Sequence, residues 1–386
     1  MDVWRRQRDE LNRREAEGLL RRPVELETAC GPRVRVDGRE VVCFCSNDYL
    51  SLAADPVLKA AAVAAIERWG VGAGASRLVS GTMTPHRRLE RRLAEFKGVE
   101  AAVVTSTGWQ ANHVAIQALA GAGDLVFCDK LNHASILTAA FACGARARTY
   151  PHGNVARLEA LLRRHRGDGR RCLIVTDSVF SMDGDLAPLS ALADLRDRHD
   201  CLLMVDEAHA TGVLGEGGRG AAELLGVEGR VDVTVGTLSK ALGCLGGFVA
   251  GRGELIDTIV NAGRAYIYTT ALPPALCAAA LAALDVVRAE PARRVKVLGL
   301  AERLRERLAV AGFGTSASRS QIVPVHLGEA ARAVEVSRRL LEAGFLVPAI
   351  RPPTVPKGAS RLRISLCAGH QEAEVDRLAG RLAECR

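Results

Sequence analysis

The sequence predicts an α/β protein built on a doubly wound, mainly parallel sheet. From about residue 55 onwards, short β-branched apolar runs alternate with longer stretches of helical periodicity, the pattern of successive β–α units. One of these runs, Cys201–Val205, is apolar at every position, as expected of a strand buried on both faces. Aromatic residues make up only 4% of a chain that is 48% hydrophobic, which suits layered α/β packing. At 386 residues, the chain is long enough for more than one domain.

Residues 1–54 are expected to form an N-terminal helix and hairpin segment. The first residues are charged and helical in pattern, and Asp37-Gly38 is a typical hairpin turn. Residues 55–285 should then form the large α/β domain, with early helices over 56–69 and 84–97. The strands expected in this domain are 101–105, 125–128, 172–176, 202–206, 232–236 and 248–250.

A smaller C-terminal α/β domain is predicted over 286–386. A long helix through about 273–309, interrupted at Pro291, should lead into it because proline cannot continue the helical hydrogen bonding. Three strands and one helix are then expected to alternate. These are strands 321–327, 345–349 and 361–366 and a helix at 329–343.

Charge and apolar content disfavour nucleic acid and membrane as partners. The formal net charge is +8, but arginines and acids are interleaved in amphipathic stretches such as 87–95, which is typical of a solvated helix face. No nucleic-acid-binding motif accompanies them. The longest apolar helical stretch, 276–284, is far too short to span a bilayer. Eleven dispersed cysteines, several of them in apolar runs, favour reduced thiols and a cytoplasmic protein.

Lys240 is the first candidate for chemistry. It follows the β-branched run 231–235 and is flanked by glycines and hydroxyls, an unusual place for a solubilising charge. An amine held there is suited to act as a nucleophile that forms a Schiff base, with its charge disfavoured by burial or cationic neighbours. A lysine that merely closes a strand–helix turn is the alternative.

Asp206 ends a predicted strand 34 residues before Lys240, and His209 comes three residues after Asp206. In open α/β sheets, ligands bind beyond the carboxyl ends of the strands, which is where all three side chains would lie. A buried carboxylate needs a cationic partner, and a protonated pyridine nitrogen is one. Aspartate on the ring nitrogen with lysine on the aldehyde indicates pyridoxal 5'-phosphate (PLP). The alternatives are a metal pair and a helix cap, but no further ligand cluster supports a metal.

Three more segments follow predicted strands. Thr105–Asn112 opens a helix, where the backbone at Gly108 and Trp109 could hold a phosphate, although an ordinary capped helix fits as well. His133 could stack on a planar cofactor and hydrogen-bond a substrate carboxylate, or be a structural histidine. Ser181, in a hydroxyl-rich loop with Asp-Gly, could reach the phenolic oxygen of the cofactor.

Two loops complete the candidate features. The stretch 349–356 is rigid because it is rich in proline, and Arg351 with Thr354 could clamp a carboxylate there. A solvated arginine is the alternative. The glycine-rich stretch 73–82 lacks the G-x-G-x-x-G spacing behind a strand, so a nicotinamide cofactor is not expected.

With these motifs in order, the chain resembles the α-oxoamine synthases, a branch of the fold-type I PLP-dependent enzymes. The resemblance runs from Ser46–Leu50 to Arg361–Arg363, and the order and spacing of the motifs make it specific. It implies a PLP-dependent acyltransferase that acts as a homodimer. The loop 350–356 is similar to that of members which condense L-alanine with a pimeloyl thioester, carried by coenzyme A or acyl carrier protein, on the route to biotin.

The resemblance also implies a role for each site residue. Lys240 would bind the aldehyde, Asp206 the pyridine nitrogen and His209 the phenolic oxygen. Thr237 and the backbone at Gly108 and Trp109 would hold the phosphate, Ser181 would support the ring, and His133 would stack over it. Trp109 stands where the family commonly has Tyr or Phe. The residues that would meet the substrates are Arg21, Asn47, His133, Arg351 and Thr354, with Arg22 as the alternative to Arg21.

Other activities remain open at this point. The same scaffold serves members that use glycine or serine, including glycine C-acetyltransferase and 5-aminolevulinate synthase. A nicotinamide-dependent oxidoreductase and a non-catalytic basic binding protein are the alternatives from other classes. Both are disfavoured by the motifs above.

Overall fold

The computed structural model describes residues 3–314 and 317–386, and these divide into two compact units. The large unit comprises Leu50–Ser181 and Asp185–Arg294. The small unit comprises the residues up to Tyr49, Met182–Gly184 and Val295–Arg386, so the N-terminal segment groups with the C-terminal region. The three-part division expected from the sequence stays a prediction.

The large unit is built on a seven-stranded sheet with the order β3-β9-β8-β7-β6-β4-β5. Only β9 runs antiparallel to its neighbours, which confirms the doubly wound, mainly parallel α/β sheet. The strands are β3 (Ala101–Thr105), β4 (Leu125–Asp129), β5 (Arg146–Tyr150), β6 (Cys172–Asp177), β7 (Leu202–Asp206), β8 (Val233–Thr237) and β9 (Gly247–Gly251).

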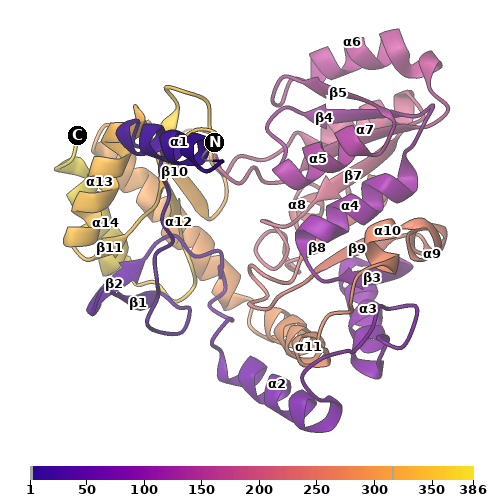
Figure 1. Ribbon diagram of the computed structural model, residues 1–386, viewed down its shortest axis with the longest axis horizontal. Coiled ribbons are helices and arrows are strands. Elements are labelled where there is room, and N and C mark those ends of the chain that lie inside the picture. Colours follow the sequence, from indigo (N-terminus) through magenta and orange to yellow (C-terminus); the bar gives the residue numbers. More distant parts are fainter. Residues whose placement is uncertain (1–2, 315–316) are drawn as a thin grey trace. The chain divides into compact units, whose positions relative to one another are not determined.

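Helices cover this sheet, and α4 and α5 pack against each other over one of its faces (Figure 1). Buried Val114, Ile116 and Ile136 from these two helices join strand residues in the main apolar core. The helices of the large unit are α2 (Pro56–Trp69), α3 (Thr84–Lys97), α4 (Gly108–Leu119), α5 (Ala134–Ala142), α6 (Val155–His165), α7 (Leu189–Arg198), α8 (Ala221–Leu224), α9 (Gly253–Ala262), α10 (Arg264–Ile267) and α11 (Pro274–Ala289), with the 3-10 turns η1 (Arg166–Asp168) and η2 (Glu228–Arg230).

The small unit contains two three-stranded sheets, with the orders β1-β2-β11 and β10-β13-β12. Its strands are β1 (Arg33–Val36), β2 (Arg39–Cys43), β10 (Ile322–Gly328), β11 (Phe345–Leu346), β12 (Ala349–Ile350) and β13 (Ser360–Ser365). Its helices are α1 (Arg5–Ala16), most of α12 (Ala292–Val310), α13 (Ala330–Glu342) and α14 (Glu372–Ala383). The C-terminal α/β architecture is therefore as predicted.

Two local expectations can be compared directly with the backbone. The predicted turn is confirmed, because Asp37 and Gly38 have φ angles of 49° and 71°, the left-handed pair that a tight hairpin requires. The single strand expected at 345–349 is wrong. It is split into β11, which pairs with β2, and β12, which pairs with β13. Pro348 lies between them and has no N–H to continue a ladder.

Within the described ranges, no helix combines the length and the apolar character needed to cross a bilayer. All eleven cysteines lie in these ranges and carry free thiols.

His152 lies between two carboxylates at the edge of the large unit's sheet. Its Nδ1 is 3.1 Å from Asp129 Oδ1 and its Nε2 is 2.9 Å from Asp185 Oδ2. Hydrogen bonds to Asp129 and then Asp185 raise the pKa of His152 from 6.5 to about 10. A raised folded-state pKa means that the charged histidine stabilises the fold fully below pH 6.5, and that this contribution is lost as the pH rises through about 10.

We therefore expect His152→Gln to destabilise the protein at pH 6 and to do so progressively less as the pH approaches 10. The variant keeps polar bulk but cannot be protonated. Urea unfolding of parent and variant at several pH values between 6 and 10 measures the difference in free energy of unfolding. A difference that stays constant over this interval would contradict the assignment of a charged histidine.

Candidate active site

The predicted cofactor residues all follow carboxyl ends of parallel strands in the large unit. Gly108 and Trp109 come after β3, His133 after β4, and Ser181 after β6. The remaining four lie at or just beyond the ends of two neighbouring strands. Asp206 ends β7 and His209 follows it, while Thr237 ends β8 and Lys240 follows it. Parallel strands end at one edge of a sheet, so this edge is the candidate site.

Lys240 and His209 are in direct contact. β7 and β8 are parallel neighbours in register, with Asp206 opposite Val235. Lys240 Nζ consequently lies 3.0 Å from His209 Nε2, in a half-buried setting. The amine of Lys240, which follows β8, thus meets the imidazole of His209, which follows the same strand, β7, that ends at the buried Asp206.

Asp206 is held by two donors and is 5% exposed. Its Oδ1 accepts from the Ala208 N–H at 2.8 Å, and its Oδ2 accepts from Asn112 Nδ2 at 2.7 Å. Sequence reasoning missed Asn112, which is buried in α4 beside Ala111, Ala115 and Ile116 and so needs polar partners. These two donors fix the orientation of the carboxylate.

His133 caps α5 and faces the same edge. Its backbone N–H donates to Asp177 Oδ2 at 2.7 Å, and its Nδ1 is 2.8 Å from Ser135 Oγ. The Trp109 ring meets the imidazole edge-on, with 6.0 Å between the centroids. Burial lowers the pKa of His133, opposed by the nearby Asp206. The lowered pKa favours a neutral imidazole, and the two hydrogen bonds hold the residue in place, as stacking on a flat ring would need.

A small cradle at the start of α4 is suited to an anion. Thr107 caps the helix through a hydrogen bond from the Gln110 N–H, and the described chain provides no acceptor for the N–H groups of Gly108 and Trp109. A Cβ on Gly108 would come within 3.2 Å of Thr237 Cβ, so the helix start and the end of β8 are in contact. Thr237 Oγ1 is also 2.6 Å from Ser239 Oγ. Backbone donors and hydroxyls at a helix N-terminus fit a phosphate.

Gly247 on β9 leaves room for this cradle. A Cβ there would lie 2.4 Å from Thr107 O and 2.7 Å from Gly108 Cα. We expect Gly247→Ala to push this segment away, to weaken cofactor binding and to lower stability by about 1–3 kcal/mol. Gly229→Ala is the matched control, because its Cβ meets nothing within 4 Å. Cofactor titration by absorbance measures the affinity, and an unchanged affinity would refute the contact.

Ser181 is half-buried and ends the first segment of the large unit. It follows the loop that begins at Ser178, whose Oγ donates to Glu207 Oε2 at 2.7 Å. This hydrogen bond therefore holds the loop against the Asp206–His209 segment. The role of Ser181 toward the cofactor ring stays a prediction.

The predicted substrate residues lie in the small unit. Arg21 Nη2 donates to Pro352 O at 3.0 Å, and Arg351 donates to Gly18 O, so the structure joins Arg21 to the proline-rich loop. Arg22 instead pairs with Glu15 on the surface, which favours Arg21. Burial and the nearby Arg21 lower the pKa of Arg351. An anion would relieve this repulsion between two guanidinium groups.

Thr354 and Asn47 complete this set. Thr354 is exposed, and its N–H donates to Arg351 O. Asn47 Oδ1 accepts from Arg363 Nη1 at 3.1 Å and from Tyr49 Oη at 3.0 Å. Arg363 is a further residue that sequence reasoning missed as a contact of the predicted set. The substrate roles of these residues stay predictions.

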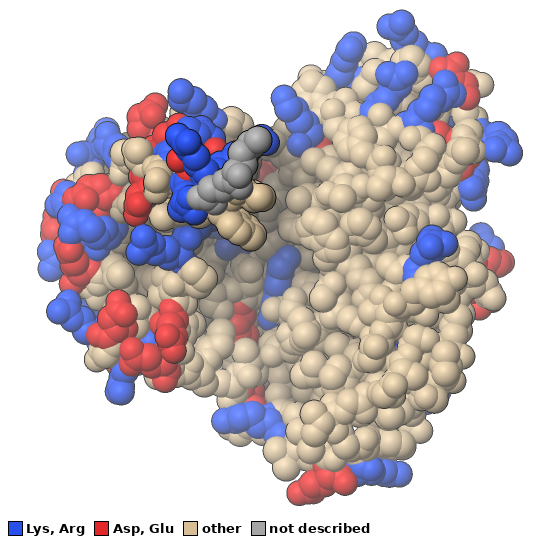
Figure 2. All heavy atoms as spheres, in the orientation of Figure 1, with Lys and Arg blue, Asp and Glu red and all other residues tan. Residues whose placement is uncertain are grey.

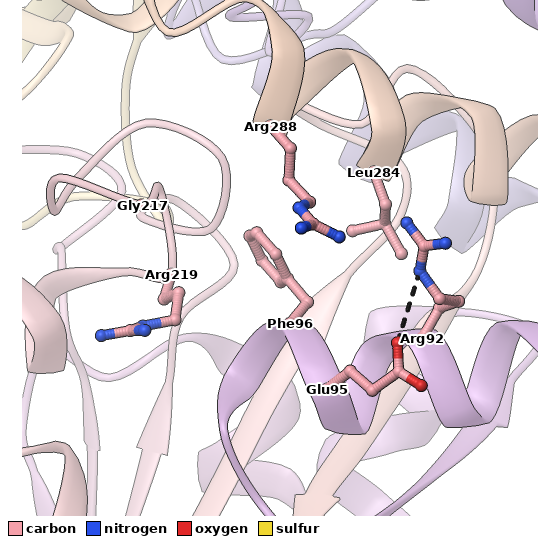
Figure 3. Close-up of a pocket in the computed structure, with 7 residues that line it drawn as sticks. All are labelled: Arg92, Glu95, Phe96, Gly217, Arg219, Leu284 and Arg288. Carbon is pink, nitrogen blue, oxygen red and sulfur yellow. Dashed lines mark ion pairs between the residues drawn. The ribbon is translucent and has the colours of Figure 1, made fainter.

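Hollows elsewhere on the large unit do not contain this chemistry. A pocket of about 400 Å³ is lined by Arg92, Phe96, Arg219 and Arg288, among others (Figure 3). A second pocket includes Val99 and Val231, which precede β3 and β8, so it lies at the opposite edge of the sheet from Lys240. Size therefore does not identify the site in this protein, and the side chains do.

Comparison with known proteins agrees with this geometry. The family model described as aminotransferase class I and II matches residues 39–382. The 8-amino-7-oxononanoate synthase of Geobacter sulfurreducens is 52% identical over 97% of this chain and 96% of its own length. The chain belongs to the class I and II aminotransferase family, which makes it a PLP-dependent enzyme of fold type I. Within that family it is a member of the 8-amino-7-oxononanoate synthases, which are C-acyltransferases.

Solved structures of related enzymes share the fold of this chain. Serine palmitoyltransferase of Sphingomonas wittichii has a TM-score of 0.94 and 33% identity, covering 100% of this chain and 98% of that one. A related structure determined with PLP has a TM-score of 0.94 at 32% identity and the same coverage. The 8-amino-7-oxononanoate synthase of Francisella tularensis has a TM-score of 0.76 and 28% identity over 89% of this chain and 97% of that one.

The residues at the strand ends fit PLP. Lys240 offers an amine for the aldehyde, and buried Asp206 offers a carboxylate for the pyridine nitrogen. The cradle offers the backbone N–H groups of Gly108 and Trp109 as donors for the phosphate, next to the Thr237 hydroxyl, which donates to Gly246 O at 2.8 Å in this structure. The donor set therefore matches each polar end of the cofactor.

Proposed function

We propose that the enzyme condenses L-alanine with a pimeloyl thioester to give 8-amino-7-oxononanoate, CO2 and the free carrier thiol in biotin biosynthesis. The observation that carries this proposal is the 3.0 Å contact of Lys240 with His209 beside a buried Asp206, in a chain 52% identical to a named 8-amino-7-oxononanoate synthase. Both the catalytic amine and the sequence relationship are needed. Either alone would fit other PLP enzymes.

The chain's own residues account for the bond changes. Bound PLP supplies an aldehyde for amines and a ring that accepts electrons from bonds broken at Cα. Lys240 would hold the cofactor by its aldehyde in the resting enzyme, and the same amine would take the proton from the substrate Cα. The resulting carbon forms a bond to the thioester carbonyl while the carbon–sulfur bond breaks. The carboxylate of alanine then leaves as CO2, and a proton returns to the same carbon.

Neighbouring side chains would orient the cofactor and the substrate and stabilise their charges during these changes. Asp206 would keep the ring nitrogen protonated, and His209 would hydrogen-bond the phenolic oxygen. His133 would stack on the ring and bind the substrate carboxylate. In the small unit, we assign substrate binding to Arg21, Asn47, Arg351 and Thr354, since the paired guanidinium groups suit carboxylates.

A steady-state comparison of amino acids and acyl thioesters tests this function. We expect alanine with pimeloyl thioesters to give the highest kcat/KM, with glycine and serine far below. Coenzyme A and acyl carrier protein thioesters should be compared, because both carriers fit the chemistry. Little activity with alanine would refute the substrate assignment, even if borohydride reduction still fixes the cofactor on Lys240.

A serine-using synthase is the second candidate, favoured by the TM-score of 0.94 to serine palmitoyltransferase. The sequence relationship weighs against it, because identity to that protein is 33%, against 52% to the 8-amino-7-oxononanoate synthase of Geobacter sulfurreducens. A preference for serine with a long-chain acyl thioester would select this candidate.

A homodimer in the cytoplasm completes the proposal. Trp109, Phe141 and Tyr268 are 47%, 61% and 74% exposed on the large unit. In Figure 2, the visible face over α4 and α5 carries few charged side chains. A second copy of the chain would cover such apolar surface. The free thiols suit a reducing compartment. Neither nucleic acid nor membrane is expected as a partner.

A further inference from the structure

Two side chains connect the carboxylate of Asp206 to the imidazole of His133. Asn112 Nδ2 lies 2.7 Å from Asp206 Oδ2 and 2.9 Å from Ser135 Oγ. Ser135 Oγ in turn lies 2.8 Å from His133 Nδ1. Asn112 and Ser135 are 2% and 1% exposed, so water does not compete for the hydrogen bonds of the Asn112 amide, whereas the bond from Ser135 to the exposed His133 is only partly buried.

The donors and acceptors in this chain favour one direction, because it is the one that gives every proton an acceptor. An ionised Asp206 only accepts, so the Asn112 amide must turn its NH2 toward it, since the opposite orientation would set two oxygens against each other. The second N–H of that amide then points at Ser135 Oγ, which accepts it. The Ser135 hydroxyl is left to donate its own proton to His133 Nδ1.

The backbone gives an independent indication of the same direction. The Ser135 N–H also points at His133 Nδ1, at 3.3 Å. A ring nitrogen that accepts from a backbone N–H carries no proton of its own, and the Ser135 N–H has no other role than donor. The neutral imidazole must then hold its proton on Nε2.

We propose that Asn112 is a positioning residue that sets the tautomer of His133 through Ser135, so that the imidazole presents Nε2–H. The charged groups around this imidazole are Asp206, Lys240 and Asp177. Burial and Lys240 lower the pKa of His133 and Asp206 raises it, while burial raises the pKa of Asp177. The neutral form is therefore kept by its surroundings as well as by the hydrogen-bonded chain.

The consequence for catalysis rests on the proposed function. An Nε2–H donor can hydrogen-bond a substrate carboxylate, whereas the Nδ1–H tautomer would offer a lone pair and repel it. The same amide occupies Oδ2 of Asp206 and leaves Oδ1, with its Ala208 N–H, for the ring nitrogen. One asparagine thus orients both the imidazole that would stack on a face of the cofactor ring and the carboxylate that would meet the ring nitrogen.

Nitrogen-15 NMR of the histidine-labelled, cofactor-free full-length protein tests the tautomer without substrate or turnover. The His133 signals are assigned by their loss in His133→Gln. We expect the parent protein to show neutral His133 with the proton on Nε2. A parent spectrum with the proton on Nδ1 would overturn the proposal, whatever reaction the enzyme catalyses.

Asn112→Asp should reverse the direction of the chain. The new carboxylate and Asp206 share one proton, so the net charge there stays the same. The Ser135 hydroxyl can then donate to the new carboxylate and accept from His133 Nδ1, which must carry a proton. We expect the pKa of His133 to rise by about one unit, a tenfold change in its protonation equilibrium. Asn261→Asp, an exposed asparagine on α9, is the matched control.

A Ser135→Ala background separates the hydrogen-bonded chain from simple proximity. The double variant Asn112→Asp, Ser135→Ala should have the same pKa of His133 as the single variant Ser135→Ala, because without the hydroxyl the hydrogen-bonded chain is broken. An equal rise in both backgrounds would show a direct electrostatic effect and overturn the proposal. Circular dichroism shows whether each variant folds. If Asn112→Asp does not fold, the proposal is tested by the tautomer of His133 in the parent protein and by the pKa of His133 in Ser135→Ala. Unchanged His133 signals in Ser135→Ala would refute the proposal.

Discussion

Lys240→Ala should reduce turnover by at least about 10⁴-fold while leaving the fold intact. The substitution removes the amine that binds the aldehyde and the base that takes the Cα proton, and positioned general bases alone contribute about 10²–10⁴-fold. Lys240 is half-buried at the sheet edge and contacts His209, so its loss leaves a small polar gap rather than an apolar cavity. Steady-state assays with alanine and a pimeloyl thioester measure the loss.

The covalent assignment needs a readout other than rate. Parent protein treated with PLP and borohydride should carry the label on Lys240, identified by peptide mass, and the variant should carry none there. Lys59→Ala is the matched control, because Lys59 is exposed on α2. A Lys240→Ala enzyme with normal activity, or a parent labelled only at another lysine, would refute the assignment.

The main sheet was predictable because its signals are local. Apolar runs such as those of β6 and β7 are buried at every or nearly every position, and strand ends in a parallel sheet meet at one edge. Asp206, His209 and Lys240 could therefore be placed together from their positions after strands. β5 was missed because its sequence, Arg146–Tyr150, is polar and half-exposed, as an edge strand can be.

Long-range pairing could not be predicted in the same way. β11 pairs in parallel with β2, and this joins residues about three hundred positions apart in a sheet that no local pattern announces. The contacts of the Asn112 amide pose the same difficulty. Its partners, Asp206 and Ser135, come from two other β–α units, so the site's supporting hydrogen bonds appear only when the strands are assembled. Sequence periodicity identifies the groups that react more readily than the groups that hold them.

Asp206→Asn should slow removal of the alanine Cα proton by about 10²–10³-fold or more, the range seen when a charge-stabilising group is lost. The amide has nearly the same shape and can still accept from Asn112, but it no longer supplies the negative charge that keeps the pyridine nitrogen protonated. Cofactor should still bind, since Lys240 and the cradle at Gly108 are untouched. Exchange of the alanine Cα proton in D2O, followed by NMR, measures the step without the thioester.

A comparison of Asp206→Asn with Asn112→Asp separates the effect of the negative charge at Asp206 from the effect of the hydrogen-bond direction toward His133. Asp206→Asn removes the negative charge, whereas Asn112→Asp keeps one shared charge and reverses the hydrogen bonds toward His133. If charge alone matters for proton removal, the first variant should be far slower in exchange than the second. Asp257→Asn on exposed α9 is the control for the loss of a carboxylate. Exchange at the parent rate in Asp206→Asn would rule out its electrostatic role and leave Asp206 as a purely structural acceptor for Asn112.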